Sequence, residues 1–288
     1  MGRRRSDPPG VAGMVLVDKA QGLTSHDVVG RARRGLGIGR VGHSGTLDPM
    51  ATGLLILGAG WATRLLRFTD AAAKTYEAEV TLGVETDTWD ADGRVVSTGR
   101  VAVTEDEVRS ALAALEGDLE QVPPMHAAIK VGGEKLYEKA RRGEVVERAP
   151  RAVTVHAIEF AEMRGEAVCF VLTCSAGTYV RSIAHDLGAA LGCGAHLSAL
   201  RRTAIGPHSV VDATSVERLD EGGRALLRPP LDLVAHLPRF VADAEGVARV
   251  AAGRRLGEVG PGLAAVVSET GELLAVYEGG RPVVTAPS

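Results

Sequence analysis

The order in which helix and strand patterns follow one another limits the folds open to this chain of 288 residues. Apolar and polar side chains alternate along residues 74–83, which predicts a strand with one buried face. A helix is predicted over residues 104–117, where Thr104 and Glu107 form a capping box at its start. Other helix and strand patterns succeed each other without a regular βαβ repeat. We therefore expect an α+β fold rather than a doubly wound parallel sheet.

Changes in composition divide the chain into three parts. Residues 1–12 are basic and contain Gly and Pro, which predicts a flexible tail. Residues 13–230 hold most of the helix and strand patterns and end at a pair of prolines. Residues 237–288 contain one short helix pattern and strand patterns separated by glycines, which predicts a small β-rich domain.

The charged residues and the cysteines exclude several classes of protein. The net charge is −3, so a basic face for a polyanion would come from local runs of Arg and Lys, which could equally be solvated surface. The three cysteines lack C-x-x-C spacing, which argues against a disulfide framework or a zinc site and fits a reducing cytoplasm. No apolar run reaches membrane-spanning length, so we expect a cytoplasmic protein that does not bind membranes.

A glycine-rich stretch, GRVGHSGTLDPMATG at residues 39–53, stands directly before the apolar run LLILG. The glycines at 37, 39 and 42 fit the G-x-G-x-x-G pattern of dinucleotide-binding proteins. That pattern requires a strand before it and a helix after it, whereas a basic helix pattern precedes it here. A phosphate-binding P-loop is also excluded, because the chain has no Gly-Lys-Ser/Thr triplet.

Two interpretations of Asp48 in this stretch stay open on the residues alone. Pro49 suits the first position of a helix, which would make Asp48 its N-cap. Capping does not require several neighbouring glycines, whereas close approach of a ligand to the main chain does. His43 lies five residues upstream, where a turn would direct it toward the same space, although it could equally be a structural histidine.

Six segments, in the same order, resemble the motifs of the TruB family, the bacterial pseudouridine synthases that act on the TΨC loop of tRNA. GHSGTLDPMATGLL resembles the catalytic motif of this family, and GMVLVDKAQGLTSHDVV resembles its first motif. The other four are KTYEAEVTLGVETDTWDADG, PPMHAAIKVGGEKLYEKARRG, GTYVRSIAHDLG and LRRTAIGP. The resemblance covers about residues 13–207.

The resemblance implies a fold, a domain plan and a partner. The α+β fold would be a mixed, largely antiparallel sheet flanked by helices, in a catalytic domain over residues 13–230. An RNA-clasping insertion is expected at about 123–151, and a PUA-like RNA-binding domain at 237–288. The activity would be isomerisation of uridine to pseudouridine at position 55 of tRNA, with the T-arm stem-loop as partner. No cofactor, metal or obligatory protein partner is expected, and the protein would be a monomer.

Three residues would carry the reaction if the resemblance holds. Asp48 would attack C1′ of the ribose or remove a 2′ proton, and the sequence does not choose between these routes. Arg181 would pair with Asp48 and favour its charged form, and Tyr76 would stack on the target base. Without the family, Arg181 could be a surface residue at a helix start and Tyr76 could simply pack in the core.

The resemblance also implies a set of residues at the substrate. They are His43, Tyr179, Leu200, Lys19, Asp90, Lys130 and Arg202. Asp90 belongs to an acidic run, which would repel RNA phosphates, so it is expected to brace the edge of the site. The target base must leave its stack, which costs a few kcal/mol, and stacking on an aromatic side chain can recover about 1–3 kcal/mol.

Two other functions were weighed against the synthase. An RNA N-glycosidase would release the base, but glycoside hydrolysis typically uses two carboxylates, whereas the motif supplies one acidic residue and a cation. A non-catalytic tRNA-binding chaperone would have no need of both Asp48 and Arg181. The motif favours the synthase, and both functions stay as alternatives to it.

Overall fold

The computed structural model describes most of the chain. The predicted tail lies outside it up to position 9, as does much of the predicted insertion. The described residues are 10–125, 130–131, 133–136, 142, 144 and 146–287.

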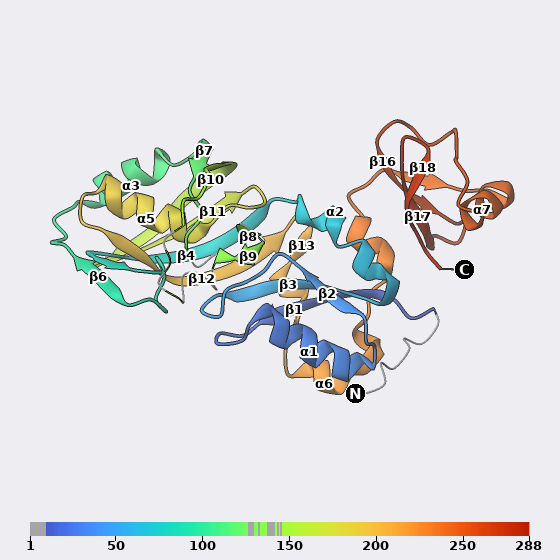
Figure 1. Ribbon diagram of the computed structural model, residues 1–288, viewed down its shortest axis with the longest axis horizontal. Coiled ribbons are helices and arrows are strands. Elements are labelled where there is room, and N and C mark those ends of the chain that lie inside the picture. Colours follow the sequence, from blue (N-terminus) through green and yellow to red (C-terminus); the bar gives the residue numbers. More distant parts are fainter. Residues whose placement is uncertain are drawn as a thin grey trace. The chain divides into compact units, whose positions relative to one another are not determined.

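The first of two compact units is made of residues up to 49, 53–71 and those from 206 onward. Its N-terminal half is a small sheet covered by helices α1 and α6 (Figure 1). Apolar side chains of α1 and of the strands share one buried core, so the arginines of α1 lie away from it. The elements are β1 (Gly13–Lys19), antiparallel to β3 (Thr52–Ala59) and parallel to β14 (Thr214–Ser215), then β2 (Val41–Ser44), α1 (Ser25–Leu36) and α6 (Arg218–Gly222).

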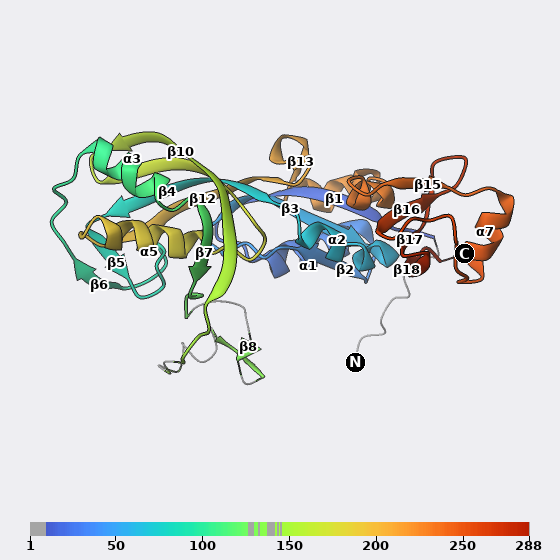
Figure 2. The same ribbon diagram turned by 90° about the horizontal axis from the view of Figure 1, so that it is seen from above.

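The C-terminal part of this unit is a separate sheet of four strands, which lie side by side in Figure 2. Its core contains the fully buried ring of Tyr277, whose hydroxyl donates to the carbonyl of Arg254 (2.8 Å). The expectation of a β-rich C-terminal part is confirmed. The elements are β15 (Arg239–Val241), α7 (Ala244–Ala251), β16 (Leu263–Val267), β17 (Leu273–Glu278) and β18 (Arg281–Thr285).

The second compact unit, residues 50–52 and 72–205, is built on an antiparallel sheet with two helices. Helix α5 packs on β12 and β4, and α3 packs on β10 and on α5, so both helices cover the same face (Figure 1). The strand order is β12 (Ala195–Ile205), β4 (Lys74–Leu82), β11 (Ala167–Cys174), β10 (Arg151–Arg164) and β7 (Gly117–Gln121), with α3 (Glu105–Ala113) and α5 (Val180–Ala190). The expected mixed, largely antiparallel sheet with flanking helices is confirmed.

Two local predictions are confirmed in this unit. Along β4, the residues Tyr76, Ala78, Val80 and Leu82 are all buried, as their alternation requires. At α3, the hydroxyl of Thr104 accepts from the N–H of Glu107, and the Glu107 carboxylate accepts from the N–H of Thr104.

Short elements complete the described part of the chain. None of its helices is both long and apolar enough to cross a membrane. The short strands and helices are β5 (Val84–Thr86), β6 (Val95–Thr98), β8 (Lys130–Val131), β9 (Glu134–Lys135), β13 (His208–Ser209) and α2 (Arg67–Asp70). Four 3₁₀ turns span Gly60–Arg64, Val210–Asp212, Gly223–Leu226 and Pro230–Val234.

Candidate active site

Asp48 is half-buried in the turn between β2 and β3. β2 ends at Ser44 and β3 begins at Thr52, so the residues after Asp48 enter a strand and not a helix. The interpretation of Asp48 as a helix N-cap is therefore wrong, because pairing with β1 and β2 extends the chain directly after the turn. Gly45 has a φ of 68°, a left-handed conformation that favours glycine.

The turn is held through the main chain on both sides of Asp48. Ser25, buried at the first position of α1, accepts a hydrogen bond from the N–H of Leu47 (2.9 Å) and donates one to its carbonyl (3.1 Å). The carbonyl of Pro49 accepts from the N–H of Gly22 (2.8 Å). Since both neighbours of Asp48 are fixed, few positions are open to its carboxylate.

Lys19 is fully buried at the end of β1, where its ammonium group meets main-chain carbonyls. Its Nζ lies 2.7 Å from the carbonyl of Leu23, 3.1 Å from that of Ala20 and 3.5 Å from that of Pro49. A buried ammonium needs such acceptors, because it has lost its water. This geometry gives Lys19 a structural part, bracing the Asp48 turn, rather than a direct contact with RNA.

A second group of hydroxyls holds the start of the same turn. Ser44 is fully buried, and its hydroxyl donates to Oδ1 of Asp70 at 2.7 Å. The Thr69 hydroxyl lies 2.7 Å from the same Ser44 oxygen. Helix α2 thus fixes the end of β2, and with it the point from which the turn begins.

Arg181 and Asp90 form a buried ion pair in the second unit. Each side chain is 6% exposed, and an Arg181 nitrogen lies 3.1 Å from Oδ2 of Asp90. The same nitrogen lies 3.3 Å from the carbonyl of Thr88 and donates to it. The alternative of Arg181 as a surface residue is therefore wrong. A cation in the first turn of α5 opposes the helix dipole, and the nearby carboxylate offsets this cost.

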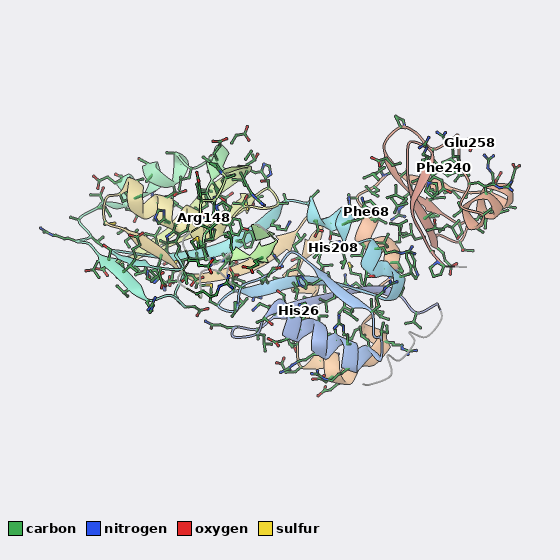
Figure 3. The ribbon with its side chains drawn as sticks, viewed as in Figure 1. His26, Phe68, Arg148, His208, Phe240 and Glu258 are labelled. Carbon is green, nitrogen blue, oxygen red and sulfur yellow. The ribbon has the colours of Figure 1, made fainter. Side chains whose placement is uncertain are left out.

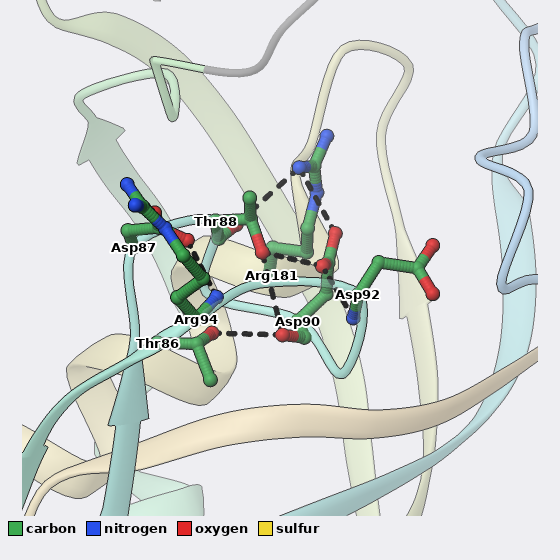
Figure 4. A network of polar contacts seen from close by, with 7 residues as sticks. All are labelled: Thr86, Asp87, Thr88, Asp90, Asp92, Arg94 and Arg181. Carbon is green, nitrogen blue, oxygen red and sulfur yellow. Dashed lines mark hydrogen bonds and ion pairs between the residues drawn. The ribbon is translucent and has the colours of Figure 1, made fainter. Parts of the chain in front are cut away.

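The loop around Asp90 presents this carboxylate to Arg181 (Figure 4). Its Oδ1 accepts from the Thr88 hydroxyl (2.6 Å) and from the N–H of Asp92 (3.1 Å). Its carbonyl accepts from the Thr86 hydroxyl (2.7 Å). The two threonines were missed in the sequence, where only the acidic residues of the run drew attention. Asp90 thus braces Arg181, and an ordering of the edge of the site by the acidic run stays a prediction.

Tyr76 and Arg202 stand opposite each other on neighbouring strands. Tyr76, on β4, is in register with Leu172 of β11 and with Arg202 of β12. Its ring is 7% exposed, which core packing also requires, so stacking on a base stays a prediction. Arg202 is 1% exposed, and this burial favours a role inside the protein over a contact with phosphate.

Tyr179 is fixed by a residue that the sequence did not single out. Gln121, at the end of β7, is buried and lies beside the start of α5. Its side-chain oxygen accepts from the N–H of Tyr179 (2.9 Å), and its amide group donates to the Tyr179 carbonyl (3.4 Å). A glutamine that serves only main-chain groups leaves no local sequence signal.

The other predicted substrate residues are placed as follows. His43, on β2, lies edge-on to the ring of His26 with centroids 6.4 Å apart; His26, on α1, is labelled in Figure 3. Leu200 is partly exposed on β12, so it is not plain core. The side chain of Lys130 lies outside the described part. In that part, no group of three or more His, Cys, Asp or Glu residues is placed to hold a metal ion.

Two family models match the chain. The model of the TruB family pseudouridylate synthase N-terminal domain matches residues 33–180, which is half of the chain. The chain belongs to the TruB family. The model of the tRNA pseudouridylate synthase B C-terminal domain matches residues 181–225. TruB proteins are pseudouridine synthases, so the chain is an isomerase of the tRNA-modifying class. Neither model reaches the C-terminal sheet, for which a PUA-like character stays a prediction.

Relatives along the whole chain support this assignment. The tRNA pseudouridine synthase B of Aromatoleum aromaticum is 52% identical over 238 residues, covering 81% of this chain and 77% of that protein. The protein of the same name from Nocardia farcinica is 44% identical over 281 residues, covering 96% and 91%. Among solved structures, a Cbf5–Nop10–Gar1 complex contains a chain that is 30% identical, with a TM-score of 0.72, covering 95% of this chain and 79% of that one. The fold is thus that of the pseudouridine synthases.

Proposed function

We propose that the chain isomerises uridine to pseudouridine at position 55 in the TΨC loop of tRNA, after turning the base out of its stack. A tRNA substrate is supported by the name that the relatives share. The position rests on the resemblance of the residues around Asp48 to the family's catalytic motif. The observation that carries the proposal is the half-buried Asp48 on a turn whose neighbouring residues are fixed by Ser25 and Gly22.

The chemistry requires a carboxylate beside the ribose. The bond between N1 and C1′ breaks, the base rotates, and a bond forms between C5 and C1′; C5 then loses its proton to water and N1 takes up a proton. Asp48 would serve as the nucleophile at C1′ or as the base at the 2′ position. Arg181 has five N–H donors, so in this proposal it stabilises Asp48 as well as Asp90. Tyr76 would stack on the base that has left the loop.

Binding would rely on residues beyond this catalytic set. Tyr179, Leu200 and His43 are proposed to contact the nucleotides of the loop, and Lys130 its backbone. The C-terminal sheet would add affinity as a PUA-like domain. Because phosphate contacts release counterions, binding should weaken as salt rises. We propose that the chain acts alone, in the cytoplasm where tRNA is found.

Release of tritium from a tRNA transcript that contains 5-³H-uridine tests the proposal. The C5 proton is lost only when the base is rejoined through C5, so one tritium per tRNA should appear. A transcript with cytidine at position 55 is the matched control and should release none. Free uracil without tritium release would establish the glycosidase instead, and binding without either product would establish the chaperone.

A further inference from the structure

Helix α5 meets the loop that carries Asp90 at two successive turns. Arg181 makes the buried contact with Asp90. His185 lies four residues further on the same face of the helix and contacts the same loop. Its ring stacks on Trp89, with centroids 4.2 Å apart and 30° between the planes, and its Nε2 lies 3.2 Å from Oε1 of Glu85. The helix therefore holds the loop by one buried and one half-buried contact.

The His185 ring lies between two carboxylates. Besides Glu85, on β5, the carboxylate of Asp186 lies 3.3 Å from its Nδ1. Neutral imidazole has a single N–H and can donate to only one of them, whereas imidazolium can donate to both. A charged ring over Trp89 also gains a cation–π attraction. Among the described residues, Glu85 and Asp186 are the charged groups that the ring contacts.

The environment of His185 also favours the charged form of its ring. The hydrogen bond that the ring donates to Asp186 raises the pKa of His185 most; partial burial lowers it, and the charges of Asp186 and Glu85 raise it again. The net effect is a pKa above the ordinary value of histidine. The charged form that the geometry favours therefore persists to higher pH than it does in an unperturbed histidine.

Trp89 is the one described residue other than glycine with a positive φ, of 62°. Such a conformation is strained for a bulky side chain and persists only where the surroundings hold it. The main chain of Trp89 is held at both ends: its N–H donates to Thr86 (3.2 Å) and its carbonyl accepts from the N–H of Leu197 (3.0 Å). Its side chain is held by the His185 ring. Because Trp89 directly precedes Asp90, release of its side chain would shift that carboxylate.

We infer that His185 is a positioning residue: as imidazolium it clamps Trp89 and Glu85, and so keeps the Asp90 carboxylate on Arg181. The inference rests on the proposed function, which gives Arg181 a part in turnover. A histidine whose folded pKa is raised contributes fully below its unfolded pKa and loses its contribution as pH rises through the folded pKa. The clamp should therefore hold at low pH and weaken as the pH rises through the raised pKa of His185.

Turnover as a function of pH tests the clamp. The single-turnover rate of tritium release is measured at saturating protein from about pH 6 to 9, together with the Kd for tRNA. His185→Gln should lower the rate about 3–10-fold near neutral pH, with a Kd within about 2-fold, and should approach the wild type at the alkaline end. His156→Gln, at an exposed histidine of β10, is the matched control and should follow the wild type throughout. Equal rates for His185→Gln and the wild type at every pH would overturn the inference.

Two further measurements do not depend on activity. The chain has two tryptophans, so Trp61→Phe leaves Trp89 as the only indole. Imidazolium quenches a stacked indole, and the emission should rise as His185 loses its proton, a step that His185→Gln removes. Amide hydrogen exchange over residues 86–94 should be faster in His185→Gln than in the wild type. An inactive wild type would refute the proposed function, and exchange then decides whether His185 holds the loop; unchanged exchange would refute that too.

Discussion

Two segments of the molecule carry acidic residues that the proposed reaction uses, and charge contributes differently to holding each of them. The Asp48 turn, residues 44–49, is fixed by buried hydroxyls, by main-chain groups and, at Pro49, by the ammonium of Lys19. The Asp90 loop, residues 85–94, also has hydroxyl and main-chain contacts, and in addition it is held by charge through its contacts with Arg181 and His185. Hydroxyl and main-chain groups do not titrate near neutral pH, whereas imidazole does. In the proposed function, the reacting carboxylate would therefore stand on a support that does not titrate near neutral pH, and the assisting carboxylate on one that does.

The largest effect is expected from Asp48→Asn. The amide has nearly the same shape, so the turn should stay intact, but it can neither attack C1′ nor remove the 2′ proton. The single-turnover rate should fall by at least about 10³-fold, with the Kd for tRNA within about 3-fold. Tritium release and filter binding measure the two quantities. If tRNA binding collapsed together with the rate, Asp48 would be chiefly a structural part of the turn.

The second-largest loss of turnover is expected from Asp90→Asn, because it removes a counter-charge from the buried Arg181. Breaking a buried pair costs about 3–5 kcal/mol, and the hydrogen bonds of the amide should reduce this to about 3 kcal/mol. Urea unfolding measures the loss, and turnover should fall about 10²-fold.

Asp92→Asn is the matched control for that variant. Asp92 is exposed and reaches Asp90 only through its main-chain N–H. The turnover rate and the stability of Asp92→Asn should therefore stay near those of the wild type. An equal loss in both variants would mean that the acidic run acts through its total charge and not through the single ion pair.

Ser25→Ala changes the Asp48 turn, and its effect on turnover should be intermediate. It leaves the buried N–H and carbonyl of Leu47 without their partner, which costs about 1–3 kcal/mol. We expect turnover to fall about 10-fold, because the residue before Asp48 is loosened. Thr24→Ala is the control: it removes the N-cap of α1, at about 1 kcal/mol, without touching Leu47. Equal rates in the two variants would show that Ser25 contributes only stability.

The difference between local patterns and long-range contacts explains what could be predicted from the sequence. The capping box of Thr104 and Glu107 and the buried face of β4 are local patterns, and both are confirmed. The N-cap interpretation of Asp48 was also local, and it failed because strand pairing overrides the preference of Pro49. A capped helix needs only its own residues, whereas a strand needs partners from elsewhere in the chain.

The site was harder to predict than the fold. The resemblance names candidate residues for the site but not the groups that hold them in place. The contact of Arg181 with Asp90 joins positions 91 residues apart in sequence, and the burial of Lys19 and Arg202 depends on how strands close around them. Gln121 and Ser25 serve main-chain groups, which leave no pattern in a single sequence.

The smallest effect is expected from Arg94→Gln, which sharpens the comparison within the Asp90 loop. Arg94 pairs with Asp87 at 3.2 Å, but its side chain is 92% exposed. Exposed pairs contribute little, because water and salt screen them. Turnover and the urea midpoint should therefore match the wild type, at low and at moderate salt. A loss comparable to that of Asp90→Asn would mean that the loop behaves as one cooperative network. If Arg94→Gln keeps the turnover and urea midpoint of the wild type while Asp90→Asn loses both, burial decides which charges hold the loop.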